Sequence, residues 1–229
     1  MVVPDGQQLA SVGDDLLVKL WEAGTGKLIR TFDGHAKQTP EGYATALYAL
    51  AVSPDGKVLA SGDRVGVVCL WETDTGKLLG QLKAPTFYTY DARTRVRSIG
   101  GIRSLSFSPD GSTLAIGGIG KVTNVDGFVG PCRVELWDWQ AEKHLATGQD
   151  KHQAILNDLT FHPDEPYLIT AGGGDSGGLL AFWDPKKAQL KHKVKPKGHI
   201  QRLILDTPGQ RILTAGADGF QVWGCQNNS

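Results

Sequence analysis

The sequence predicts an all-β protein built from one four-stranded antiparallel unit that is repeated along the chain. Five tryptophans each close a short apolar segment, and they recur at intervals of 40 residues or more. A turn containing proline lies upstream of each tryptophan, and the segments around it follow the two-residue period of strands. No long stretch follows the 3.6-residue period of a helix. The tryptophans are Trp21, Trp71, Trp137, Trp183 and Trp223.

Each unit begins with an alternating strand, as at 102–107 and 156–161. A proline turn follows, because proline presets the backbone for the turn while Asp and Gly supply a local hydrogen bond and a positive φ. A second strand of small and β-prone residues comes next, then the strand that ends in tryptophan. A tight turn and a fourth strand, as at 25–29 and 75–79, complete the unit. The proline turns are 4–6, 54–56, 109–111, 163–165 and 208–210, and the second strands are 9–11, 59–61, 114–116, 168–170 and 212–214.

The composition excludes several classes of protein. The 229 residues carry 24 Lys plus Arg against 24 Asp plus Glu, so no overall field attracts nucleic acid or an anionic membrane. A globular chain of this length buries about 70% of its unfolded surface and needs no disulfide or metal. Cys69, Cys132 and Cys225 lack a paired ligand spacing, which favours a reducing compartment. No segment resembles a signal peptide or has the ~20 apolar residues of a membrane helix, so we expect a cytoplasmic protein without a membrane partner.

Three short motifs accompany the repeat. Ser-Pro-Asp-Gly occurs at 53–56 and 108–111, Trp-Asp at 137–138 and 183–184, and Gly-His at 34–35 and 198–199. With these motifs the chain resembles the WD-repeat β-propeller family from Val3 to Trp223. The resemblance implies a single propeller domain over 1–229, with blades at approximately 1–34, 35–84, 85–150, 151–198 and 199–224. We expect 225–229 to form a disordered tail.

The resemblance also implies a buried hydrogen-bond network in each blade. In this family the network joins the tryptophan, a Ser or Thr of the second strand, a His and a turn Asp. The fifth copy has all four residue types, whereas Val65 replaces the expected Asp of the second copy and Ile116 replaces the Ser or Thr of the third. The residues assigned to the network are Trp21, Ser11, Asp15, Trp71, Ser61, His35, Trp137, Trp183, Thr170, His152, Trp223, Thr214, His199 and Asp218.

The strand count predicts an incomplete ring. The first unit begins inside its first strand, and no fourth strand follows Trp223. The resemblance implies seven or eight blades for a full ring, and only five signatures are present. We therefore expect an open arc of five blades that belongs to a larger protein or closes by pairing with another chain. A small five-bladed ring is the alternative. The open edges of an arc would favour self-association.

Four long departures from the repeat are predicted to lie on one face. They span 36–46, 84–101, 117–131 and 172–178, and each connects either a fourth strand to the next blade or a second strand to a third. Insertions of this kind gather on binding faces, so we expect a partner surface here rather than neutral drift. The segment 84–101 holds the candidate contact residues Phe87, Tyr88, Tyr90, Arg93, Arg95 and Arg97. Composition supports equally an arrangement in which the aromatics fold back on the blade and the arginines are solvated.

Other residue clusters carry weaker functional hypotheses. Lysines alternate through 186–197, and we interpret them as protection of an outer edge strand rather than as a nucleic-acid site, because no aromatic residue is interleaved. The glycines of 172–178 lack the ending of a phosphate-binding loop and predict a flexible connection. No histidine has a companion at a metal-ligand spacing, and no nucleophile is placed for a catalytic triad.

We therefore predict a non-catalytic scaffold that binds a protein or peptide through the face carrying the insertions. It would need no cofactor and no metal. The alternatives are a propeller enzyme or small-ligand binder that uses the central channel, and a weak nucleic-acid contact through the lysine-rich strand at 186–197.

Overall fold

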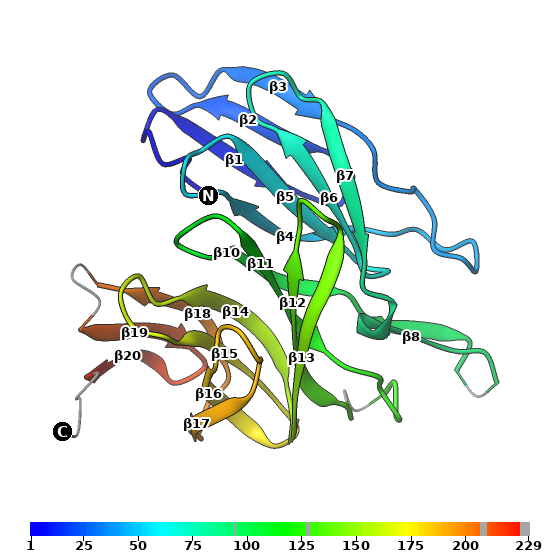
Figure 1. The fold of residues 1–229 in the computed structure, drawn as a ribbon. Helices are drawn as coiled ribbons and strands as arrows, with labels where there is room; N and C mark the ends of the chain where they lie inside the picture. The colour runs from blue at the N-terminus through cyan, green and yellow to red at the C-terminus, as the bar shows by residue number, and fades with distance from the viewer. Residues whose placement is uncertain (94, 127–128, 207–209, 225–229) are drawn as a thin grey trace.

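The computed structural model describes residues 1–93, 95–126, 129–206 and 210–224. The predicted all-β class is confirmed: successive antiparallel sheets follow one another around an arc (Figure 1). The described residues contain no helix long and apolar enough to cross a membrane. The fifth proline turn lies largely outside the described residues, as do Cys225 and the predicted tail at 225–229.

Five sheets form in chain order, and we call them blades 1 to 5. Blade 1 consists of β1 (Gln8–Val12), β2 (Val18–Glu22) and β3 (Leu28–Phe32), and blade 2 of β4 (Leu47–Val52), β5 (Val58–Asp63), β6 (Val67–Glu72) and β7 (Leu78–Lys83). Blade 3 consists of β10 (Ile102–Phe107), β11 (Thr113–Ile119), β12 (Pro131–Asp138) and β13 (Lys143–Gln153), and blade 4 of β14 (Ile155–Phe161), β15 (Leu168–Gly174), β16 (Gly177–Trp183) and β17 (Leu190–Val194). Blade 5 consists of β18 (Ile200–Leu205), β19 (Arg211–Gly216) and β20 (Gly219–Gly224). A separate hairpin of β8 (Tyr88–Asp91) and β9 (Arg97–Gly100) follows the 3₁₀ turn η1 (Pro85–Phe87).

The proline turns form for local reasons that the sequence shows. In blade 2 the hydroxyl of Ser53 accepts the N–H of Val58 at 2.9 Å, and the Asp55 carboxylate accepts the N–H of Lys57 at 3.1 Å. Gly56 has a φ of 75°, which a residue with a side chain adopts only with strain. The turn at 108–111 repeats this arrangement in blade 3. These turns stay short and regular.

The core lies between successive blades rather than inside any one of them. Each blade has an apolar face toward the next blade along the chain, which we call its forward face. The tryptophan-bearing rear face of the next blade covers it. Trp71 packs on blade 1 and Trp183 on blade 3, and the two side chains are 2% and 0% exposed. Burying one large apolar side chain contributes about 1.5–3 kcal/mol, so these layers hold the blades in their order.

The blades do not close into a ring, and the terminal blades have three strands each, as predicted. No strand of blade 5 pairs with blade 1 among the described residues. The forward face of blade 5 is open, with Phe220 90% and Val222 62% exposed, whereas the matching Leu180 of blade 4 is 1% exposed. At the other end of the arc Leu9 is partly exposed on the rear face of blade 1.

One predicted loop is wrong. The segment 172–178 is not a long flexible connection, because β15 and β16 pair through it as far as Gly174 and Gly177. The glycines permit this close pairing: a side chain at Gly172 would meet the carbonyl oxygen of Ile155 at 1.9 Å. The glycine run therefore extends a hairpin, and three long insertions remain.

Candidate functional site

The three remaining insertions lie together on one face of the arc. They comprise the connection from β3 to β4 at 36–46, the segment 84–101 with the β8–β9 hairpin, and the connection from β11 to β12 at 120–130. We call their described residues the platform. In Figure 1 the connection after β3 and the β8 hairpin extend on the same side of the molecule.

The first insertion is joined to the hairpin by tyrosines. The hydroxyl of Tyr88 donates to the Glu41 carboxylate at 2.5 Å, and the rings of Tyr43 and Tyr90 lie 6.1 Å apart between centroids. Burial and this bond to Glu41 raise the pKa of Tyr88. A hydrogen bond with Tyr43 is the largest cause that raises the pKa of Tyr90 to about 12. Both phenols are therefore neutral at physiological pH.

The hairpin is joined to the third insertion by charged groups. Arg95 Nε lies 2.5 Å from Asp126 Oδ2, and Arg97 Nη2 lies 2.8 Å from Asp126 Oδ1. Arg97 also donates to the carbonyl oxygen of Val125 at 2.6 Å, and the N–H of Val122 donates to the Thr89 hydroxyl at 3.0 Å. The three insertions thus form one connected surface.

The platform is anchored to the blades by buried apolar side chains. Phe87 is 1% exposed and belongs to the core between blades 2 and 3. Below the hairpin, Ile99 packs with Ile119, Val122 and Val125 in a cluster of its own. Such packing holds the exposed side chains above it in place.

The structure separates the predicted contact residues into three groups. Phe87 supports the platform from below and reaches no partner. Tyr88 and Tyr90 are half-buried, and Arg93, Arg95 and Arg97 are exposed. Glu41, Tyr43 and Asp126 are platform residues that the sequence analysis did not single out. The sequence could have indicated them only through their location, because they lie in insertions that were predicted to share one face.

The complete four-residue network occurs in blade 2. Trp71 Nε1 donates to the Ser61 hydroxyl at 2.9 Å, and His35 Nε2 lies 2.8 Å from the same oxygen. His35 Nδ1 lies 3.1 Å from Asp63 Oδ2. The expectation that this copy lacks its acid was therefore wrong. Asp63 ends β5, and its other oxygen accepts the N–H groups of Val65 and Val67 at 3.0 and 2.8 Å.

The other blades keep only parts of the network. The tryptophans Trp21, Trp183 and Trp223 each donate to the predicted hydroxyl at 2.9 Å, from Ser11, Thr170 and Thr214 respectively. In blade 3, Trp137 donates instead to Glu135 at 3.1 Å, and Arg133 pairs with that carboxylate at 2.7 Å.

The predicted acids and histidines of these blades take other positions. Asp15 is exposed and pairs with Lys19 at 2.5 Å. His152 is buried, and its Nε2 has no hydrogen-bond partner among the described residues. His199 and Asp218 are exposed, so the full set expected in the fifth copy does not assemble into a buried network.

The lysine-rich segment forms the outer edge of blade 4. β17 pairs only with β16 among the described strands, and its free edge faces outward. Lys193 lies 2.6 Å from Asp150 of the preceding blade, and Lys191 lies 3.6 Å from Asp184. These carboxylates neutralise part of the basic run.

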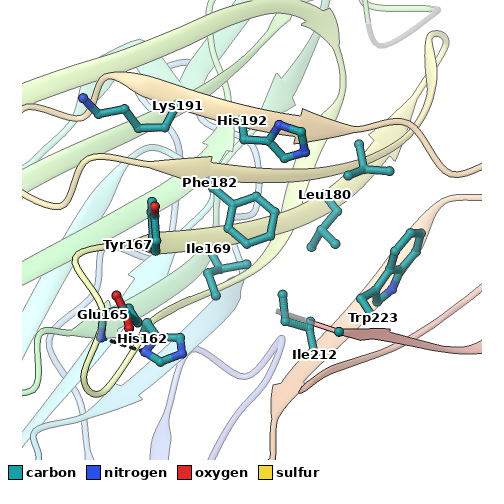
Figure 2. A pocket seen from close by; sticks show the side chains of 12 residues that line it. His162, Glu165, Tyr167, Ile169, Leu180, Phe182, Lys191, His192, Ile212 and Trp223 are labelled. Carbon is teal, nitrogen blue, oxygen red and sulfur yellow. Dashed lines mark hydrogen bonds between the residues drawn. The ribbon is translucent and has the colours of Figure 1, made fainter. Parts of the chain in front are cut away.

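A cavity of about 390 Å³ lies between blades 4 and 5 (Figure 2). Trp223 and Ile212 face Leu180 across it, and the His162 ring lies beside Glu165. His162 Nδ1 accepts the N–H of Glu165 at 2.9 Å, so the ring supports a turn. No Ser, Thr or Cys is among the described residues that line this cavity. Nor do the described residues contain a group of three or more His, Cys, Asp or Glu side chains that could hold a metal ion.

Comparison with known families agrees with the repeat and the open sheets. The family model "WD domain, G-beta repeat" matches residues 26–72, 94–127 and 142–184, which together make up more than half of the chain. The chain therefore belongs to the WD40-repeat family. No curated protein matches it significantly. WD40 repeats generally act as protein-interaction scaffolds and are typically not enzymes.

Proposed function

We propose that this protein is a non-catalytic scaffold that binds a protein partner through the platform. The observation that supports this most directly is the connection of all three insertions by side-chain bonds. Insertions that had drifted neutrally would have no reason to bond to one another, since long surface loops cost little free energy. Here tyrosines and arginines, the residue types that dominate binding energy, hold the insertions together or lie exposed on them.

The opposite face provides an internal comparison. Its turns stay short where the structure describes them, as in the proline turn at 54–56 and the turn after Trp71 at 74–77. A scaffold needs one variable, structured face on a rigid support, and among the described residues the long departures from the repeat lie on the platform face.

Affinity capture with two matched double variants tests the proposal. Arg93→Glu/Lys121→Glu reverses two exposed charges on the platform, and Lys57→Glu/Lys77→Glu reverses two on the opposite face. Proteins captured from a lysate of the source organism by the unmodified chain should be lost with the first variant and retained with the second. Both variants should melt within about 2 °C of the unmodified protein, because exposed substitutions change stability by about 0.5 kcal/mol or less. Equal recovery with the platform variant, or equal loss with the control, would contradict the proposal.

A further inference from the structure

Two arginines lie close to Gly101, where the platform joins blade 3. Arg64 follows β5, and its guanidinium donates to the Ser98 hydroxyl of the hairpin at 2.9 Å. Arg103 lies on β10, with its guanidinium 4.0 Å from the centre of the Tyr48 ring. A side chain at Gly101 would meet both the Tyr48 ring at 2.9 Å and the Arg64 Cα at 3.1 Å. The backbone of Arg64 and the ring that Arg103 covers therefore both approach Gly101.

Neither arginine has a carboxylate partner among the described residues, where every ion pair within 4.0 Å involves other groups. Arg103 Nη2 donates to the carbonyl oxygen of Gly100 at 3.1 Å, but its Nε is buried without a partner in the part of the chain described. Burial, and to a lesser extent the charge of Arg64, lower the pKa of Arg103. A half-buried guanidinium without an anion is unfavourable, and an incoming carboxylate would relieve that cost.

Arg103 lines a central cavity of about 720 Å³. The innermost strands of the arc surround this cavity, which we call the channel. Arg202 also lines it, and its guanidinium lies 3.9 Å from Asp158 Oδ2. Asp158 is the sole acidic residue among the described lining residues, and the N–H of Leu203 already donates to it at 2.9 Å. The channel thus has an excess of positive charge.

We propose that the channel mouth at Arg64 and Arg103 binds an acidic peptide segment of the protein partner. The inference rests on the proposed function and specifies the chemistry of the partner. A planar guanidinium binds a carboxylate through two parallel hydrogen bonds, and the exposed Arg93 and Lys121 on the platform attract an acidic chain toward it.

The same surface is poorly suited to nucleic acid. Single strands bind by stacking their bases on aromatic rings, and the ring beside the two arginines, Tyr48, is covered by Arg103. Carboxylates also interrupt the positive charge, with Glu41 and Asp126 placed among the platform arginines. A regular phosphate backbone would meet these acids.

Fluorescence anisotropy with a labelled peptide of eight glutamates tests the proposal, with a peptide of eight glutamines as its uncharged match. We expect the glutamate peptide to bind the unmodified protein and the glutamine peptide not to bind. Arg103→Gln and Arg64→Gln should each weaken binding at least tenfold, and Arg103→Lys should restore part of it. Arg211→Gln is the control, because Arg211 is an exposed arginine of blade 5 paired with Asp206 at 2.6 Å. It should leave the affinity unchanged.

The proposal is overturned if the glutamate peptide does not bind, if it binds Arg103→Gln and Arg64→Gln as well as the unmodified protein, or if eight thymidylates displace it more effectively than unlabelled glutamate peptide. Should Arg103→Gln fail to fold, Arg64→Gln decides alone. Failure here is distinguishable from failure of the proposed function. If Arg93→Glu/Lys121→Glu still abolishes partner capture while the peptide does not bind, only the acidic chemistry of the partner is wrong.

Discussion

At the residue scale, the network of blade 2 shows how one carboxylate can organise a blade. Asp63 is 1% exposed. One of its carboxylate oxygens lies 3.1 Å from His35 Nδ1, and the other accepts two backbone N–H groups. His35 in turn reaches the hydroxyl that holds Trp71. The chain from carboxylate to indole is wholly buried, so each member depends on its neighbour.

Replacing Asp63 by alanine should therefore destabilise the protein far more than the same change at Asp218. Asp63→Ala leaves the buried His35 ring and two part-buried N–H groups without an acceptor, and we expect a loss of about 3 kcal/mol or more. Asp218→Ala removes an exposed carboxylate and should cost less than about 0.5 kcal/mol. Urea denaturation of the two variants measures the difference, and equal losses would show that the fifth copy also has a buried network.

His152 should make stability depend on pH. Burial and, to a lesser extent, the nearby Lys195 and Lys193 lower its pKa in the folded protein. The unfolded chain, with a histidine pKa of about 6.5, then binds more protons than the folded one. The contribution of His152 is therefore complete above that value and is lost as the pH falls below it.

Urea denaturation between pH 8 and pH 5 measures this effect as a free energy of unfolding. His152→Leu should flatten the decline at low pH, whereas His192→Gln, which alters an exposed histidine, should not. An unchanged slope in His152→Leu would assign the decline to other groups.

The sequence reveals which residue types meet in the blades but not every partner. The hydroxyls of Ser11, Thr170 and Thr214 follow from the resemblance to WD-repeat propellers, in which a Ser or Thr of the second strand bonds to the tryptophan. The roles of Asp63 and Glu135 do not follow from it. Asp63 lies two residues before the expected position, and Glu135 reaches the indole from the same strand as Trp137.

At the scale of elements, the location of the insertions was predictable and their contacts were not. Strand order alone assigns 36–46, 84–101 and 117–131 to one face. The contacts depend on side chains distant in sequence, such as Asp126 meeting Arg95 and Arg97, and no local pattern encodes such a meeting. The loop predicted at 172–178 was wrong because its glycines serve close strand pairing instead of mobility.

Asp126→Asn should loosen the platform without unfolding the blades. The ion pairs of Asp126 with Arg95 and Arg97 are partly solvent-exposed, and such pairs contribute about 1 kcal/mol or less to global stability. Local opening of the hairpin should nevertheless become more frequent, since Asp126 bridges two insertions.

Hydrogen–deuterium exchange should then speed up at 95–100 and 122–126 while the core strands stay protected. Asp15→Asn, which breaks a similarly exposed pair in blade 1, is the control and should leave the platform unchanged. Unaltered exchange in Asp126→Asn would mean that the insertions behave independently.

At the scale of the whole molecule, the open arc was predicted because five repeat signatures are too few for the seven or eight blades that the family resemblance implies. In the arc, each blade has one face toward the blade before it and one toward the blade after it. Forward faces are buried in blades 1 to 4, and the equivalent face of blade 5 leaves Ile204, Phe220 and Val222 exposed. Matched positions in blades 4 and 5 therefore have the same type of side chain in opposite environments.

Leu180→Ala and Phe220→Ala form a matched pair that tests this arrangement. Leu180 is fully buried against blade 5, and its truncation should cost about 2–5 kcal/mol. Phe220→Ala removes a side chain that is already in water and should cost less than about 0.5 kcal/mol. Thermal and urea denaturation measure both. A large loss in Phe220→Ala would show that another surface covers the forward face of blade 5 in solution.

The central claim is that the connected platform is the surface on which a protein partner binds. The most direct measurement is the hydrogen–deuterium exchange of the protein with and without its captured partner. We predict that protection on binding concentrates at 36–46, 84–101 and 120–130, and that the turns of the opposite face exchange as before. Protection confined to those turns, or to the open face of blade 5, would contradict the account.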